Sequence, residues 1–134
     1  MRRLAGLVFA LLVAQPALAG LTTAETRMAA TVDAEYERSV ALLEKLVNQN
    51  SGSTNFAGVE AVGRMMRAEL EPLGFAVVWK PMAAASRSGH LIATHKGKRG
   101  GKKLLLIAHL DTVFEKDSPF QKFVRKGEEA EGPG

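Results

Sequence analysis

Apolar residues recur at helical spacing in two stretches of the chain. The first stretch is residues 33–48, and the second follows Asn55, which is placed to cap it. Steps of three and four separate most of the apolar positions, and Pro72 and Gly74 mark the end of the second stretch. The two stripes predict two amphipathic helices whose apolar faces pack in a core. They consist of Tyr36, Val40, Leu43 and Val47 in the first helix, and of Val59, Val62, Met66, Leu70 and Leu73 in the second.

Three later segments have the composition of β-strands. Residues 75–82 and 90–97 are short and contain aromatic and β-branched residues, with a loop at 83–89 between them. The third segment is residues 102–113, in which positions 104–108 are all apolar. A strand that is apolar on both faces is typical of the middle of a sheet covered on both sides. Helices followed by such strands predict an α/β layer fold.

The first 19 residues have the build of a secretory signal peptide. A basic start, "MRR", precedes an apolar run, and "QPALAG" offers a small-x-small cleavage site after Ala19. The run at 4–14 is shorter than the roughly 20 residues of a membrane-spanning helix, so we expect no stable membrane anchor. Arg2 and Arg3 leave twin-arginine export as a minor alternative. We expect an exported protein, in the periplasm or the extracellular medium, with residues 20–32 as a flexible leader.

The charge of the chain argues against a nucleic-acid partner. The net charge is +4, and removing residues 1–19 leaves 16 basic and 14 acidic side chains. One basic run, residues 96–103, holds five basic residues and three glycines but no aromatic residue. This composition favours a solvated hairpin turn over a nucleic-acid surface. The chain has no cysteine, so any metal would be held by imidazole and carboxylate groups.

The candidate chemistry lies at the end of the third predicted strand. Side chains alternate along a strand, so His109 and Asp111 are expected on one face, with Cα atoms about 6.5 to 7 Å apart. At the carboxyl end of a strand in a mostly parallel sheet, both would reach the edge where α/β proteins bind ligands. The carboxylate could orient a metal-binding imidazole. The triplet H-x-D is also a common chance pattern, so the residues alone leave a purely structural role open.

The other two histidines are not expected to complete a site. His90 and His95 are five positions apart, which places them on opposite faces of one strand. A catalytic zinc ion normally has three protein ligands, so a three-histidine site with His109 is not expected.

The longer string around the pair resembles a known enzyme family. The string "LLLIAHLDTVF", followed by "SPF" and then by "EGPG", is similar to the di-zinc exopeptidases of the glutamate carboxypeptidase and aminoacylase type. In that family an apolar strand ends in H-x-D-x-V. The upstream string "LLEKLVNQNSGSTNFAGVEAVGRMMRAELEPLGFAV" also resembles the two opening helices of the family and the exit into its first strand. The resemblance covers residues 33–134.

The resemblance implies both a fold and an activity. Residues 33–134 would be the N-terminal part of a three-layer α/β/α zinc-peptidase catalytic domain, with an incomplete sheet. His109 would be a ligand of one of two zinc ions, and Asp111 the acidic site residue that steadies it. The implied reaction is hydrolysis of an amide bond next to a free carboxylate, in a peptide or an N-acyl amino acid. The complete parent enzyme would be a candidate homodimer.

The same resemblance implies that the 134-residue chain is an inactive fragment. The remaining metal ligands and the glutamate base of the family would follow Gly134, so we expect no tight zinc binding by this chain. Glu128, Glu129 and Glu131 do not match those positions, and we expect them in an exposed acidic hairpin. The alternative is a small exported binding or interaction protein without catalysis. A reading frame that continues with an aspartate soon after "GPG" would favour the enzyme.

Overall fold

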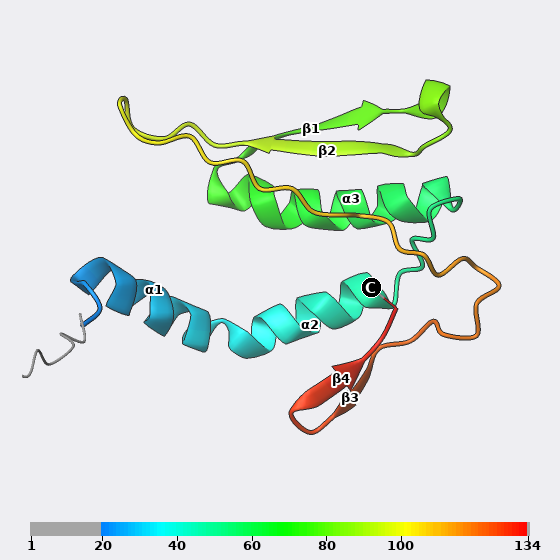
Figure 1. The fold of residues 1–134 in the computed structure, drawn as a ribbon, viewed down its shortest axis with the longest axis horizontal. Helices are drawn as coiled ribbons and strands as arrows, with labels where there is room; N and C mark the ends of the chain where they lie inside the picture. The colour runs from blue at the N-terminus through cyan, green and yellow to red at the C-terminus, as the bar shows by residue number, and fades with distance from the viewer. Residues whose placement is uncertain (1–19, 134) are drawn as a thin grey trace, which may run out of the picture. The chain divides into compact units, whose positions relative to one another are not determined.

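The computed structural model describes residues 20–133, so the expected signal peptide lies outside the described residues. Helices and small antiparallel sheets give the chain a mixed α/β fold (Figure 1). The described residues divide into two compact units, 20–35 and 36–133. The helices are α1 (Thr23–Ala34), α2 (Tyr36–Val47) and α3 (Phe56–Leu70), with short 3-10 helices at Glu71–Leu73 and Ala83–Ala85. The strands are β1 (Ala76–Pro81), β2 (Gly89–Thr94), β3 (Val124–Lys126) and β4 (Glu129–Glu131).

Helix α1 occupies most of the segment for which the sequence suggested a flexible leader. Thr22 and Glu25 form a capping box at its start. The Thr22 amide donates to the Glu25 carboxylate at 2.7 Å, and the Glu25 amide donates to the Thr22 hydroxyl at 3.3 Å. Among the described residues, regular structure begins at Thr23, inside the segment 20–32 for which composition suggested a loosely ordered leader. The T-x-x-E pattern at residues 22–25 marks a helix start, which the small, polar composition of the segment does not indicate.

The structure confirms the two predicted amphipathic helices and moves their ends. Helix α2 begins at Tyr36 rather than at residue 33, because the preceding residues belong to α1. Asn55 caps α3, since its side-chain oxygen accepts a hydrogen bond from the Gly58 amide at 3.2 Å. The helix ends at Leu70, and a 3-10 turn carries the chain to Gly74, whose φ of 85° suits glycine.

Strands β1 and β2 form an antiparallel sheet that contacts α3. Val77 lies opposite Ala93 and Trp79 opposite Leu91, and these four side chains are the less exposed ones in the two strands. The Trp79 ring lies so close to α3 that a Cβ atom on Gly63 would be 2.7 Å from it. Among the described residues, the buried apolar side chains are those of Val59 and Val62 in α3. The core is therefore small and centred on this helix.

The predicted third strand does not form. Residues 102–110 are not part of any strand, and neither β1 nor β2 pairs with them. The four apolar side chains of residues 104–107 are 83% to 93% exposed. A buried strand needs hydrogen-bonding partners along its edges and covering layers on its faces, and the described residues provide neither. The one pairing near this segment is an isolated parallel bridge between Gly52 and Thr112.

Of the two charged hairpin turns predicted from the sequence, one forms as a hairpin and the other does not. The basic run at 96–103 contains a turn in which Gly100 has a φ of 81°, but it leads from β2 into irregular chain rather than into a hairpin partner. The acidic hairpin is confirmed, since Glu129 and Glu131 lie in β4, which pairs with β3. All four strands thus belong to two-stranded antiparallel sheets. Within residues 20–133, the helices are too short or too polar to cross a membrane.

Candidate metal-ligand pair

The loop between α2 and α3 holds the segment that carries His109 and Asp111. The Thr112 amide donates to the Ser51 carbonyl at 2.9 Å, and the Ser53 amide donates to the Thr112 carbonyl at 3.1 Å. Ser51 is buried, so water competes little for these bonds. The backbone is therefore fixed directly after Asp111.

Glu115 strengthens the contact between the two segments. Its two carboxylate oxygens accept hydrogen bonds from the Thr54 amide at 3.0 Å and from the Thr54 hydroxyl at 2.6 Å. These bonds, the one from the hydroxyl first, lower the pKa of Glu115 below its usual value. A Cβ atom on Gly52 would lie 2.8 Å from the Glu115 Cα atom, so the approach of the two backbones requires glycine.

Asn50 connects the same loop to the chain beyond the site. Its side-chain nitrogen donates to the Phe114 carbonyl at 3.0 Å and to the Gln121 side chain at 2.8 Å. The side chain of Asn55, which caps α3, donates to the Asn50 side-chain oxygen at 2.8 Å. One helix cap and the segment after the site therefore share a single hydrogen-bonded network.

The structure brings His109 and Asp111 into direct contact. The His109 Nδ1 atom lies 2.9 Å from the Asp111 Oδ1 atom, and the Ser53 hydroxyl donates to the Asp111 Oδ2 atom at 2.6 Å. The hydrogen bonds from Ser53 and then from His109 lower the pKa of Asp111, so its carboxyl group is ionised at neutral pH. An ionised carboxylate only accepts, so in a neutral imidazole this contact favours the proton on Nδ1 and leaves Nε2 free to bind an ion.

A zinc ion would find one ligand here with its orienting carboxylate, but not a complete site. The His109 side chain is 90% exposed, so nothing in the described chain covers it. Both Asp111 oxygens already accept hydrogen bonds, which suits an orienting role rather than direct ligation. Among residues 20–133, no three His, Asp or Glu side chains are grouped to hold a metal ion. Zinc sites normally have three or four protein ligands.

The remaining histidines lie apart from this pair. His95 packs its ring against Phe75, with ring centroids 5.2 Å apart. His90 lies in β2 opposite Lys80. Neither lies in a group of three metal-ligating side chains within the described part of the chain.

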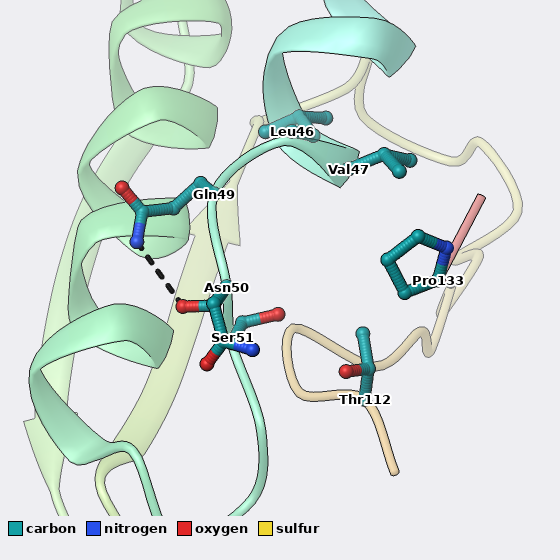
Figure 2. Close-up of a pocket in the computed structure, with 7 residues that line it drawn as sticks. All are labelled: Leu46, Val47, Gln49, Asn50, Ser51, Thr112 and Pro133. Carbon is teal, nitrogen blue, oxygen red and sulfur yellow. Dashed lines mark hydrogen bonds between the residues drawn. The ribbon is translucent and has the colours of Figure 1, made fainter. Parts of the chain in front are cut away.

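A small cavity lies beside the loop and is not a substrate pocket (Figure 2). Its volume is about 10 Å³, which is near the minimum that holds one water molecule. Gln49 donates to the Asn50 carbonyl at 3.1 Å along its wall. The lining residues are Leu46, Val47, Gln49, Asn50, Ser51, Thr112 and Pro133.

Sequence reasoning identified the pair but missed the residues that hold it. The string "NQNSGSTN" has the composition of a helix-stopping turn, and nothing in its spacing marks Ser53 as a partner of Asp111. The two residues are 58 positions apart, and neither helical nor strand periodicity connects positions at that distance. Only the folded chain shows the contact.

The mixed fold and the histidine that contacts a carboxylate are compatible with part of a peptidase domain. A sequence comparison with a known enzyme supports this class of protein. Over 104 residues the chain is 38% identical to carboxypeptidase G2 of Pseudomonas sp. (strain RS-16). The match covers 75% of this chain and 24% of that enzyme, so the chain spans about a quarter of the relative's length. No family model matches the chain. The similarity supports a carboxypeptidase-type hydrolase family, in agreement with the resemblance of the H-x-D-T-V string.

Proposed function

We propose that this chain is the amino-terminal part of an exported, zinc-dependent carboxypeptidase or amidohydrolase. The enzyme would cleave amide bonds next to a free carboxylate, in peptides or N-acyl amino acids. The observation that carries the proposal is the 2.9 Å contact between His109 Nδ1 and Asp111 Oδ1. It occurs at the H-x-D string of a chain that is 38% identical to a carboxypeptidase. Residues 1–19 would direct export to the periplasm or the medium.

In this proposal His109 is a ligand of one of two zinc ions and Asp111 positions it. When bound, zinc activates water at neutral pH and polarises the amide carbonyl. Asp111 accepts a hydrogen bond from the Nδ1–H group of His109, which keeps Nε2 unprotonated and raises its basicity as a ligand. The described residues contain no group of three metal ligands, so the other ligands and a general base must come from the rest of the polypeptide. The 134-residue chain alone would therefore be inactive.

The exposed apolar segment supports a larger catalytic domain around this chain. A row of side chains that are 83% to 93% exposed needs to be covered in a stable protein. We propose that residues 104–108 become a central strand when the rest of a three-layer α/β/α domain packs around them. The complete enzyme would be the unit that forms a homodimer.

The test uses the polypeptide encoded when the reading frame is followed beyond codon 134. With zinc, it is expected to hydrolyse a panel of dipeptides and N-acetyl amino acids, and a chelator should abolish the activity until zinc is restored. His109→Ala should abolish hydrolysis and lower the zinc content, whereas Asp111→Asn should cost about 10- to 100-fold in metal affinity or activity. His90→Ala is the matched control and should change neither quantity.

Two outcomes would overturn the proposal. Unchanged zinc content in His109→Ala would exclude His109 as a ligand. A stop codon directly after residue 134 would favour the small exported binding protein instead.

A further inference from the structure

Ser53 reaches the pair from the opposite side of the Asp111 carboxylate. Its hydroxyl has a single proton and two acceptors within range, Asp111 Oδ2 at 2.6 Å and the Thr112 carbonyl at 3.3 Å. The shorter contact is to a charged group, so it takes the proton. Ser53, Asp111 and His109 thus form one hydrogen-bonded chain, with the carboxylate in the middle.

We propose that Ser53 is a positioning residue for the His109 ligand. By holding Asp111 Oδ2, it turns Oδ1 of the same carboxylate towards His109 Nδ1 and so fixes which imidazole nitrogen is free. The role in zinc binding rests on the function proposed above. The effect on the imidazole itself does not require a metal and can be measured without one.

The exposure of the pair explains why such an anchor is needed. The side chains of His109 and Asp111 are 90% and 32% exposed. A contact between exposed charged groups is usually weak, because water and side-chain freedom compete with it. The carboxylate torsion of aspartate is also broad, so a single contact with a mobile imidazole does not define it. Ser53 is more constrained, since its own amide is bonded to the Thr112 carbonyl.

The order of the three residues differs from that of a hydrolytic Ser-His-Asp triad. In a hydrolytic triad, the serine donates to the imidazole, which the carboxylate orients from the far side. Here Ser53 donates to the carboxylate, and the imidazole lies beyond it. The imidazole is therefore not placed to accept the Ser53 proton.

The experiment measures the tautomer of His109 in the full 134-residue chain without metal. Long-range proton–nitrogen spectra at one fixed pH, at which the imidazole is neutral, give the ratio of the Nδ1–H to the Nε2–H form. We expect Nδ1–H to predominate. Ser53→Ala should lower this ratio by about 2- to 10-fold, the range that one hydrogen bond contributes. Ser53→Thr retains the hydroxyl and should restore the ratio.

Two controls show that the change is local. Ser88→Ala removes a hydroxyl that donates to the Phe56 carbonyl at 2.8 Å and to neither residue of the pair, and it should leave the ratio unchanged. The Thr112 amide shift reports whether the loop contact survives in each variant, because that amide donates to Ser51. If Ser53→Ala moves that shift, Ser53→Cys replaces it as a weaker donor of similar size, and an intermediate ratio is expected.

The inference and the proposed function fail in different ways. An unchanged tautomer ratio in the variant that keeps the Thr112 shift would overturn the role of Ser53, whatever the metal does. A predominant Nε2–H form in the unmodified chain would overturn it as well. A ratio that depends on Ser53, combined with zinc content that is indifferent to His109→Ala in the longer enzyme, would leave the positioning of His109 intact and reject zinc ligation.

Discussion

At the scale of single residues, His109 and Asp111 make one close contact of 2.9 Å but supply few ligands. One imidazole and a carboxylate that is already hydrogen-bonded do not offset the loss of water from a zinc ion. We therefore expect the 134-residue chain to show no stoichiometric zinc site of submicromolar affinity by calorimetry. A site of that affinity, lost in His109→Ala, would contradict this prediction.

The close packing of Gly63 against the Trp79 ring leads to a second prediction. An added methyl group would gain up to about 1 kcal/mol of helix propensity. It would also lie 2.7 Å from the Trp79 ring, which Gly89 already contacts closely from β2. Overpacking of this kind costs about 1 to 3 kcal/mol, so we expect Gly63→Ala to destabilise the packing of α3 on the sheet.

Trp79 itself provides the measurement, because it is the one tryptophan of the chain. Its fluorescence during denaturation should show a lower midpoint for Gly63→Ala. Gly97→Ala is the matched control, since nothing lies within 4 Å of the added group. Equal midpoints for both variants would show that the ring moves aside without cost.

The sequence predicted the candidate residues of the site but not the residue that supports them. The spacing of two between His109 and Asp111 made them a candidate pair on one face of a strand, but that strand does not form and the loop brings the two side chains together instead. The partner Ser53 could not be predicted, since its contact depends on how two distant loops meet. Spacing therefore predicted the pair but not its support.

At the scale of elements, helical periodicity and a capping residue predicted a helix correctly, whereas an apolar run alone did not predict a strand. Helix α3 follows from its apolar stripe and the Asn55 cap, all within one stretch of sequence. The run at 104–108 indicated burial, but a strand also needs neighbours to pair with. The described residues supply none, so the run is irregular and its residues 104–107 are exposed instead.

Helix α1 gives a prediction about its cap. Thr22→Ala removes the hydroxyl that accepts from the Glu25 amide and should cost about 1 kcal/mol of helix stability. Cα chemical shifts of residues 23–34 should move towards unfolded values. Thr23→Ala, which deletes a hydroxyl one position later, is the control and should have little effect.

Acidification should weaken the same helix cap, because it protonates the Glu25 carboxylate. Hydrogen bonds from Thr22, its backbone amide first, lower the pKa of Glu25, so the folded helix favours the ionised form. This contribution is present above the ordinary carboxyl pKa and is lost as the pH falls through the lowered value. Helicity that rises on acidification would contradict it.

At the scale of the whole molecule, an apolar row lies uncovered beside a small core. We expect the 134-residue chain to self-associate or to behave as a loosely packed state. Leu104→Lys combined with Leu106→Lys should reduce association in sedimentation experiments, because both side chains are more than 80% exposed. The Trp79 unfolding midpoint should not change. A monomer that melts cooperatively without these substitutions would contradict the prediction.

The contact between the α2–α3 loop and the site segment also affects the order of folding. Ser53 and Asp111 are separated by 58 positions, whereas α3, β1 and β2 are neighbours in sequence. Closing a longer loop costs more chain entropy, so helix and hairpin should assemble before the loop contact forms. Under mildly destabilising conditions, the Thr112 amide should exchange with solvent before the β1–β2 amides do. The contact between His109 and Asp111 would then be among the last to become native and among the first to be lost.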